Sequence, residues 1–460
     1  MGNMIVDDIF RGRDNMNLKK ISIDDIKNNL AEITKSNIPL WRKNREGKLV
    51  TIPHDKIDQF FGNEKYKNLN LLIEEEWHSR IKAEFELKAY NVAESSAVPV
   101  LDNYLEKIIE YKKIPAEERF NIYDANIKKL EETAAIQGIL DNNSVDVLLK
   151  ATTDAFYINK ATFEENMDEY VELPEVHLKN IAKKTTQFVD SIIKVLRQKS
   201  ISANYIDQLS ELSTGSTIDH INNVLLRFVP FCNYINSSFK KGRISRIRVN
   251  FDMEYLRHYK KLKPDTDDVK LENIFKGGLR EINPEEIKLY SLGTLLHDIG
   301  KIGNINYFEG DDDYDKQKIV KHAILGYNMI LKAKEFSGEV AVIAALHHEY
   351  YNHPSGYNLM KALFPKKHYL YNCPQYCVSY SLDDLKNGQS MSYFPAKILE
   401  IVDVFDALTD SKRIYRKKGH TTSEALKIMK ESFVENNLKI DPILFALFTD
   451  FIREHAIMDR

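Results

Sequence analysis

The strongest constraint on the fold of this sequence is an apolar run near its C-terminal end that contains carboxylates. Residues 398–408 read Ile-Leu-Glu-Ile-Val-Asp-Val-Phe-Asp-Ala-Leu, and their apolar side chains recur at the spacing of one helix face. Burying an unpaired carboxylate costs several kcal/mol, so Asp403 and Asp406 must meet a cation or a metal ion. The fold must therefore bring positive groups or metal ligands to this predicted helix.

Histidines on four other predicted helices are the candidates to accompany these carboxylates. One helix begins near Ser216, which forms a capping box with Asp219. The second ends at Gly300, the third spans Lys318–Lys332, and the fourth begins at Glu339. In chain order they carry His220; His297 and Asp298; His322; and His347 and His348. A single histidine on an apolar face is usually a hydrogen-bonded core residue, but the whole set indicates a metal site.

A pair of metal ions is the arrangement that this ligand set favours. Imidazole and carboxylate ligands without thiolate suit iron, manganese or zinc. Asp298 could bridge two metals roughly 3.5–4 Å apart, which would activate a hydroxide and hold a phosphate for in-line displacement. Lys301, one turn after His297, would neutralise a phosphate oxygen or the leaving group. The alternative for Lys301 is a solvated lysine that complements the helix dipole.

Four strings around these ligands occur in the order of a known family pattern. They are His-Asp-Ile-Gly-Lys at 297–301, His322, His-His-Glu at 347–349 and Asp-Val-Phe-Asp-Ala-Leu-Thr at 403–409. In these strings the chain resembles the HD-GYP domain family of the HD superfamily, over about residues 200–430. The resemblance implies an all-helical domain that hydrolyses cyclic di-GMP to the linear dinucleotide or GMP, with iron or manganese as the metal.

The resemblance also implies which residues hold each metal. One metal would take His220, His297, Asp298 and Asp403, and the second would take Asp298, His322 and His347. His348 matches a ligand used where a third metal is bound, but the additional glutamate of those relatives corresponds to Ser216 here. The resemblance therefore favours two divalent ions, with His348 as a phosphate contact or a support for the ligands.

The signature loop and a long insertion depart from the family pattern. The loop keeps Gly356 and Tyr357, which are candidate substrate-binding residues, but it contains an inserted residue. Asn358 replaces a proline that would fix φ, so the loop could be placed differently. The insertion, at residues 359–393, could cover the site as a lid or dock a base on an aromatic side chain. The alternative is a surface excursion without a direct role.

Charged residues near the site depart from the pattern as well. An acidic run at 309–315 would weaken any positive field around a phosphate substrate. The substrate-binding basic motif of the family persists as Lys412 and Arg413, one residue out of step. These two are candidate phosphate clamps because Arg pairs bidentately with phosphate. A solvated basic strip is the alternative.

The first 200 residues show no comparable cluster, and a weaker resemblance to N-terminal regions of some HD-GYP proteins suggests a regulatory or sensory role. We divide the chain into a disordered tail (1–17), a small mixed α/β domain (18–80), a helical regulatory or linker region (81–200) and the HD-GYP-like phosphohydrolase domain (201–460). Apolar runs on either side of Gly47 predict a β-hairpin. Residues 69–73 are a third strand or the start of a helix. The predicted fold class is mainly α, with an all-helical HD-superfamily bundle at the C-terminal end.

Composition restricts the binding partners and the cellular location that we expect for this protein. Hydrophobic residues make up 43% of the chain and its net charge is −3, so there is no global electrostatic case for a nucleic acid polymer or a membrane surface. No stretch approaches the ~20 apolar residues of a membrane span. Three cysteines argue for a reducing compartment, and we expect a cytoplasmic protein. Expected partners are cyclic di-GMP or a related cyclic dinucleotide, a diguanylate cyclase (GGDEF) or other signalling protein, and a second copy in a homodimer.

Three functions remain open from the sequence. The first is a metal-dependent phosphodiesterase for cyclic di-GMP, regulated by the N-terminal region. The second is a cyclic-dinucleotide sensor or partner-docking module with weak or no turnover, which the altered loop and the insertion motivate. The third is a phosphohydrolase of the HD superfamily that acts on another nucleotide.

Overall fold

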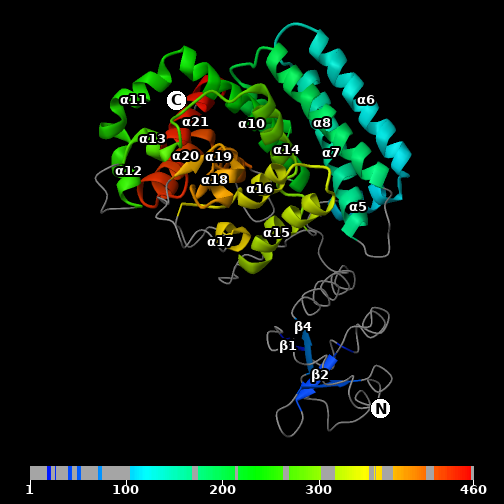
Figure 1. The fold of residues 1–460 in the computed structure, drawn as a ribbon. Coiled ribbons are helices and arrows are strands. Elements are labelled where there is room, and N and C mark those ends of the chain that lie inside the picture. Colours follow the sequence, from blue (N-terminus) through cyan, green and yellow to red (C-terminus); the bar gives the residue numbers. More distant parts are fainter. Residues whose placement is uncertain are drawn as a thin grey trace. The chain divides into compact units, whose positions relative to one another are not determined.

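Two compact units make up the chain, Met1–Leu101 and Asp102–Arg460, in a computed structural model (Figure 1). In the first unit the structure describes residues 18–21, 26, 40–43, 49–52 and 71–74. In the second it describes residues 104–167, 175–212, 216–262, 269–301, 316–351, 357, 359–364, 377–410 and 419–456.

The first unit contains a four-stranded antiparallel sheet. Its strands are β1 (Leu18–Ile21), β2 (Leu40–Lys43), β3 (Leu49–Ile52) and β4 (Leu71–Glu74), in the order β1-β4-β2-β3. The predicted pairing of β2 with β3 is confirmed, with Leu40 opposite Ile52, whereas Gly47 lies outside the described residues. Of the two alternatives for residues 69–73 the strand is correct, since β4 pairs with β1 and β2. The tail predicted at 1–17 also lies outside the described residues.

The second unit is mostly helical, which confirms the predicted fold class. Its first helices are α5 (Tyr104–Lys113), α6 (Ala116–Ala135), α7 (Asn142–Met167), α8 (Glu175–Gln198), α9 (Tyr205–Leu212), α10 (Thr217–Lys240), α11 (Arg243–Glu254), α12 (Leu256–Lys260) and α13 (Leu271–Ile274). Then come α14 (Pro284–Leu295), α15 (Lys316–Lys332), α16 (Gly338–Leu346), α17 (Leu359–Leu363), α18 (Leu382–Lys386), α19 (Phe394–Thr409), α20 (Thr422–Ile428), the π-helix η3 (Met429–Glu435) and α21 (Pro442–His455). Two short strands, β5 (Val378–Ser379) and β6 (Ser392–Tyr393), pair in parallel within the predicted insertion.

Helix α10 lies at the centre of the second unit. It packs against α14 and α19, and α14 packs in turn against α16. Helices α5 to α8 pack on one another side by side in Figure 1, and α7 and α8 also contact α10. One apolar cluster runs through this packing from Tyr104 to Ala456. The core is therefore continuous across the boundary predicted near residue 200, and the domain roles assigned on either side of that boundary stay predictions.

The helix predicted to end at Gly300 ends instead at Leu295, so His297 and Asp298 lie in the turn that follows α14. A Cβ on Gly300 would lie 2.0 Å from the His322 carbonyl oxygen and 2.4 Å from the Gly326 nitrogen. The turn therefore passes against the backbone of α15, and a side chain at position 300 would not fit there. This close approach accounts for the glycine.

Among the described helices, none has both the length and the apolar character that a membrane span requires.

Candidate metal centre

Helix α10 presents His220 to the core, and the predicted capping box fixes its first turn. The Ser216 hydroxyl accepts from the Asp219 N–H, and the Asp219 carboxylate accepts from the Ser216 N–H. His220 is buried, and its Nδ1 lies 2.6 Å from Asp406 Oδ2. When Nδ1–H donates to that carboxylate, Nε2 becomes the ring atom that can bind a metal.

The turn after α14 presents His297 in the same tautomer. This ring is fully buried, and its Nδ1–H donates to the Thr294 carbonyl at 2.7 Å. Its Nε2 is buried and makes no hydrogen bond among the described residues, and Asp298 Oδ2 lies 3.3 Å away. A buried nitrogen lone pair facing a carboxylate oxygen is costly unless a cation lies between them.

The end of α16 presents a third ring oriented in this way. His347 follows Leu346 at the C-terminal cap, and its Nδ1–H donates to the Ala344 carbonyl at 2.6 Å. Its Nε2 lies 3.2 Å from Nε2 of His322, which comes from α15. The rings of His347 and His348 have centroids 4.1 Å apart, and the ring of Tyr357 lies 4.6 Å from that of His348. Tyr357 is therefore next to the histidine cluster.

Helix α19 contributes Asp403 from the apolar run with which the sequence argument began. Asp403 Oδ1 lies 2.9 Å from His220 Nε2 and 4.0 Å from His297 Nε2. Asp403 Oδ2 lies 3.6 Å from His348 Nδ1. The carboxylate thus faces histidines from three separate elements.

Asp298 lies between two groups of histidines. Its Oδ2 is 3.6 Å from His220 Nε2 and 3.3 Å from His297 Nε2. Its Oδ1 is 3.2 Å from His322 Nε2 and 3.9 Å from His347 Nε2. Ligand atoms of His220, His297 and Asp298 cluster within 4.8 Å of one another, as do those of His322, His347 and His348. The structure thus brings together all seven residues for which the sequence predicted a metal-binding role.

The electrostatics of this centre favour neutral rings at His322 and His347 and ionised carboxylates at Asp298 and Asp403. Burial lowers the pKa of His322 to about 3, and burial together with neighbouring histidines lowers the pKa of His347 well below its usual value. Burial alone would raise the pKa of Asp298, but Lys301 and His297 hold it well below its usual value. The pKa of Asp403 is likewise held low against burial, chiefly by His348 and His220. These are the protonation states that bind metal.

The residues present therefore fit a divalent metal centre. Nitrogen and oxygen donors from five elements converge, and the buried Nε2 of His297, which has no hydrogen bond among the described residues, faces Asp298 Oδ2 at 3.3 Å. Only a cation or an added proton makes that contact favourable.

Of the predicted substrate-binding residues, the structure describes Lys301 and Tyr357. Lys301 Nζ lies 2.5 Å from Asp298 Oδ2, so this lysine is at the centre and is paired with a carboxylate. This contact favours the predicted charge role over the alternative of a solvated lysine, and both stay predictions. Gly356, Lys412 and Arg413 lie outside the described residues.

Two residues support His220: Asp406, for which sequence reasoning required a cation without naming it, and Arg227, to which it assigned no role. Asp406, which accepts from His220, is also ion-paired with Arg227, and both side chains are about 1% exposed. Arg227 lies on α10, two turns after His220, and its Nη2 donates to Ser210. A signal was present, because Arg227 is a cation within an apolar helical run and must pair when buried.

A second buried ion pair lies behind the segment that follows His348. Lys397 Nζ is 2.8 Å from Glu400 Oε2 and donates to the Glu349 carbonyl at 2.9 Å. The same ammonium lies over the Tyr351 ring, 3.9 Å from its centroid, and the Tyr351 hydroxyl donates to Asp441. Burial raises the pKa of Glu400 to about 8, although Lys397 acts in the opposite direction. This network ties the backbone after the histidine pair to α19.

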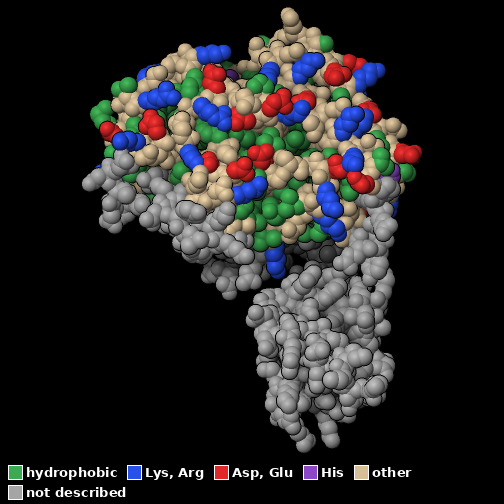
Figure 2. All heavy atoms as spheres, viewed as in Figure 1, with side chains coloured by type: hydrophobic (Ala, Val, Ile, Leu, Met, Phe, Trp, Pro, Cys, Tyr) green, Lys and Arg blue, Asp and Glu red, His purple; other side chains and the backbone are tan. Residues whose placement is uncertain are grey.

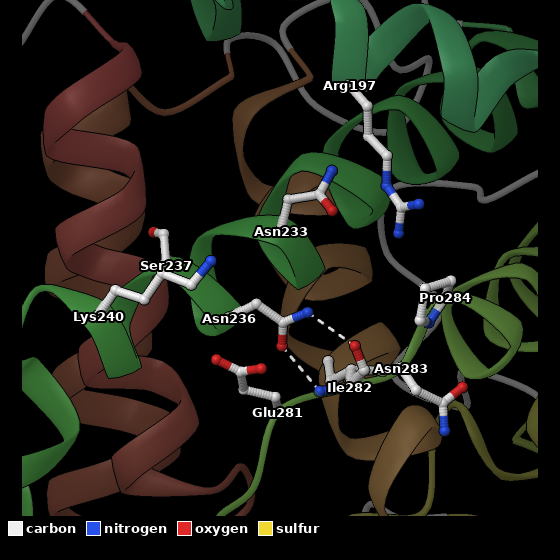
Figure 3. A pocket seen from close by; sticks show the side chains of 9 residues that line it. All are labelled: Arg197, Asn233, Asn236, Ser237, Lys240, Glu281, Ile282, Asn283 and Pro284. Carbon is white, nitrogen blue, oxygen red and sulfur yellow. Dashed lines mark hydrogen bonds between the residues drawn. The ribbon is translucent and has the colours of Figure 1, made fainter.

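A pocket of about 460 Å³ lies elsewhere, at the N-terminal end of α14 (Figure 3). The Asn236 side chain exchanges hydrogen bonds with the backbone of Ile282 across its floor, and Arg197 and Lys240 lie at its edge. The centre lies beyond the opposite end of α14, which is roughly 18 Å long at 1.5 Å per residue. The pocket contains no part of the histidine cluster.

The candidate metal centre consists of histidines and aspartates that come from separate elements of a helical domain. Residues 268–408 match the HD domain family, so this segment is an HD domain of the HD superfamily, which implies a metal-dependent hydrolase. The match includes all the predicted metal-binding residues except His220, which precedes it. Neither a curated protein nor a solved structure was found to match the chain.

Proposed function

We propose that this protein is a cyclic di-GMP phosphodiesterase of the HD-GYP type. The observation that carries the proposal is the position of Asp298, whose two oxygens face separate groups of histidines. A carboxylate in this position suits a binuclear centre. The order of the motifs and the retention of Gly356 and Tyr357 support the HD-GYP assignment.

The chain's own residues would hold two divalent ions, for which we propose iron or manganese. His220, His297 and Asp403 would bind one ion, His322 and His347 the other, and Asp298 both. When bound, such ions supply a nucleophile at neutral pH and neutralise charge on the phosphate. Asp406, Thr294 and Ala344 accept the Nδ1–H groups of His220, His297 and His347, and thereby hold Nε2 of each ring toward the centre.

Lys301 would act on the substrate by charge. Its ammonium is paired with Asp298 and its side chain is 24% exposed, so it can reach a phosphate oxygen from the solvent side. Tyr357 lies against His348, where an aromatic ring can stack on a base. We further propose Lys412, Arg413 and Gly356 as substrate contacts. On the face shown in Figure 2, Lys and Arg are interspersed with Asp and Glu. Because the described part of this face has no extended positive surface, the phosphates of the substrate would depend on such individual cations.

One assay tests the proposal. The protein is purified anaerobically with manganese or iron, and hydrolysis of cyclic di-GMP is followed, with Asp298→Ala as the control. Turnover that is lost in the variant supports the phosphodiesterase. Tight binding without turnover supports a sensor, which the altered loop and the insertion motivate. If the protein does not hydrolyse cyclic di-GMP but does hydrolyse another nucleotide, it is an HD-superfamily phosphohydrolase with a different substrate.

The wider setting follows from the same proposal. A regulatory role for residues 1–200, a cytoplasmic location, a diguanylate cyclase as partner and a homodimer remain predictions of the sequence. Measuring turnover with residues 1–101 removed is the direct test of regulation by the first unit.

A further inference from the structure

Lys160 on helix α7 is a buried cation whose partner lies 139 residues further along the chain. Its side chain is about 1% exposed, and its Nζ donates to the Ile299 carbonyl at 2.7 Å. Ile299 lies between Asp298 and Gly300, in the turn that carries two of the proposed metal ligands. A helix outside the HD domain match therefore makes direct contact with the centre's main chain.

The charge of Lys160 is held in place by its own helix. Glu164, one turn on, lies 2.9 Å from Lys160 Nζ and also pairs with Lys112 of α5 at 2.6 Å. A buried ammonium needs such a counter-charge. Because Glu164 is 25% exposed and has this second partner, the ammonium is fixed by a network that joins α5 and α7.

The Ile299 carbonyl needs a donor because helix α14 has already ended. Carbonyl groups beyond the last helical turn have no partner in the helix, and a cation complements their negative end. Lys160 supplies that donor from one direction. From another direction, the backbone of α15 lies so close to Gly300 that no side chain would fit at this position. The turn with His297 and Asp298 is thus fixed between α15 and the Lys160 ammonium.

We infer that Lys160 is a positioning residue of the metal centre, through which helices α5 and α7 set how strongly the centre binds metal. This inference rests on the proposed function to the extent that it requires metal binding. Lys160 acts through the peptide between Ile299 and Gly300, one residue after Asp298, whose carboxylate lies between the two histidine groups. Displacement of that peptide changes the positions of both Asp298 oxygens at once.

The test measures manganese affinity directly, by calorimetric titration of the full chain, in addition to cyclic di-GMP turnover. Lys160→Met keeps the length and burial of the side chain but removes the donor, and it leaves Glu164 with Lys112. We expect at least tenfold weaker manganese binding and a lower kcat with KM within about threefold of wild type.

The matched control is Arg119→Met. Arg119 is also a buried cation of the helical region, bound to Glu165, Thr162 and the Ile114 carbonyl, and it makes no contact with the turn at 297–301. We expect this variant to lose thermal stability while its manganese affinity stays within twofold of wild type. Equal loss of affinity in both variants would show a general effect of stability and overturn the inference.

Manganese affinity and kcat of Lys160→Met within twofold of wild type would also overturn it. If Lys160→Met does not fold, Glu164→Gln replaces it, since that side chain is partly exposed and only orients the ammonium. We expect about threefold weaker manganese binding from this variant, and unchanged affinity would overturn the inference. A wild-type protein that binds neither manganese nor iron would overturn both the inference and the proposed function.

Discussion

Two buried polar clusters in the second unit differ in whether their hydrogen bonds are complete. Between α6, α7 and α8, Tyr123, Asn159 and Thr185 are buried together. The Asn159 amide donates to the Tyr123 hydroxyl at 2.6 Å, and the Thr185 hydroxyl lies 3.1 Å from Asn159 Oδ1. The Tyr123 hydroxyl also reaches the Ala155 carbonyl. These groups are neutral and satisfy one another.

The centre around Asp298 is different in kind. Its rings donate outward, to Asp406, Thr294 and Ala344, while their inner nitrogens face carboxylates or one another. A fold can bury polar groups for stability alone, as the cluster at Tyr123 does. What distinguishes a functional centre is the remaining lone pairs, which the protein orients but does not satisfy. The predictions below test this distinction, from the largest expected effect to the smallest.

Asp298→Ala removes the carboxylate that both histidine groups share. We expect cyclic di-GMP hydrolysis to fall by roughly 1,000-fold or more and manganese affinity to fall by at least about 100-fold, because both proposed ions lose a ligand. Activity assays and calorimetric titration measure these effects. Retention of metal stoichiometry and turnover would show that the centre is only another structural cluster.

Asp406→Asn tests the outward hydrogen bonds without touching a proposed ligand. The amide weakens the bond to His220 Nδ1–H, so we expect manganese affinity to fall by about 10–100-fold. Asp154→Asn is the matched control, because Asp154 also accepts two side-chain hydrogen bonds, from Tyr111 and Asn126, but lies in the helical region. Manganese titration of both variants makes the comparison, and identical affinities would contradict a supporting role for Asp406.

Asn159→Ala tests the other cluster. It leaves the Tyr123 and Thr185 hydroxyls without their shared amide, and we expect the free energy of unfolding to fall by about 2 kcal/mol. Manganese affinity should remain within twofold of wild type. Urea denaturation and metal titration on the same preparation separate the two effects. A large loss of metal affinity would mean that the two clusters are coupled.

The sequence predicted the centre better than it predicted the surrounding structure. Asp403 and His297 could be found because their chemistry conflicts with the apolar helical pattern around them. The end of α14 could not be predicted, since Leu296 and Ile299 continue the apolar spacing past Leu295. The helix is followed by a turn in which Gly300 lies against α15. That contact joins segments far apart in the chain and leaves no local signal.

The residues that support the centre also differ in whether the sequence could reveal their role. Arg227 lies in the apolar run of α10, so its burial and its need for an anion could have been predicted from the pattern. Lys160 has an ordinary i,i+4 partner in Glu164 and looks like a surface lysine in the sequence. Only the packing of α7 against α15 and the turn after α14 shows that it is buried.

The contact between Lys397 and Glu400 should have the smallest effect on the metal centre, and its effect on stability depends on pH. The pKa of Glu400 is raised from 4.5 to about 8 by burial, so the folded protein holds a proton that the unfolded chain releases above pH 4.5. Stability from this group is therefore lost as pH rises from 4.5 toward 8. Relative to wild type, Glu400→Gln should gain about 3 kcal/mol in free energy of unfolding between pH 5 and pH 8, as measured by urea denaturation. A difference between the two proteins that does not change with pH would mean that Lys397 keeps Glu400 ionised, and that this cluster carries a permanent ion pair instead of a neutral carboxyl group.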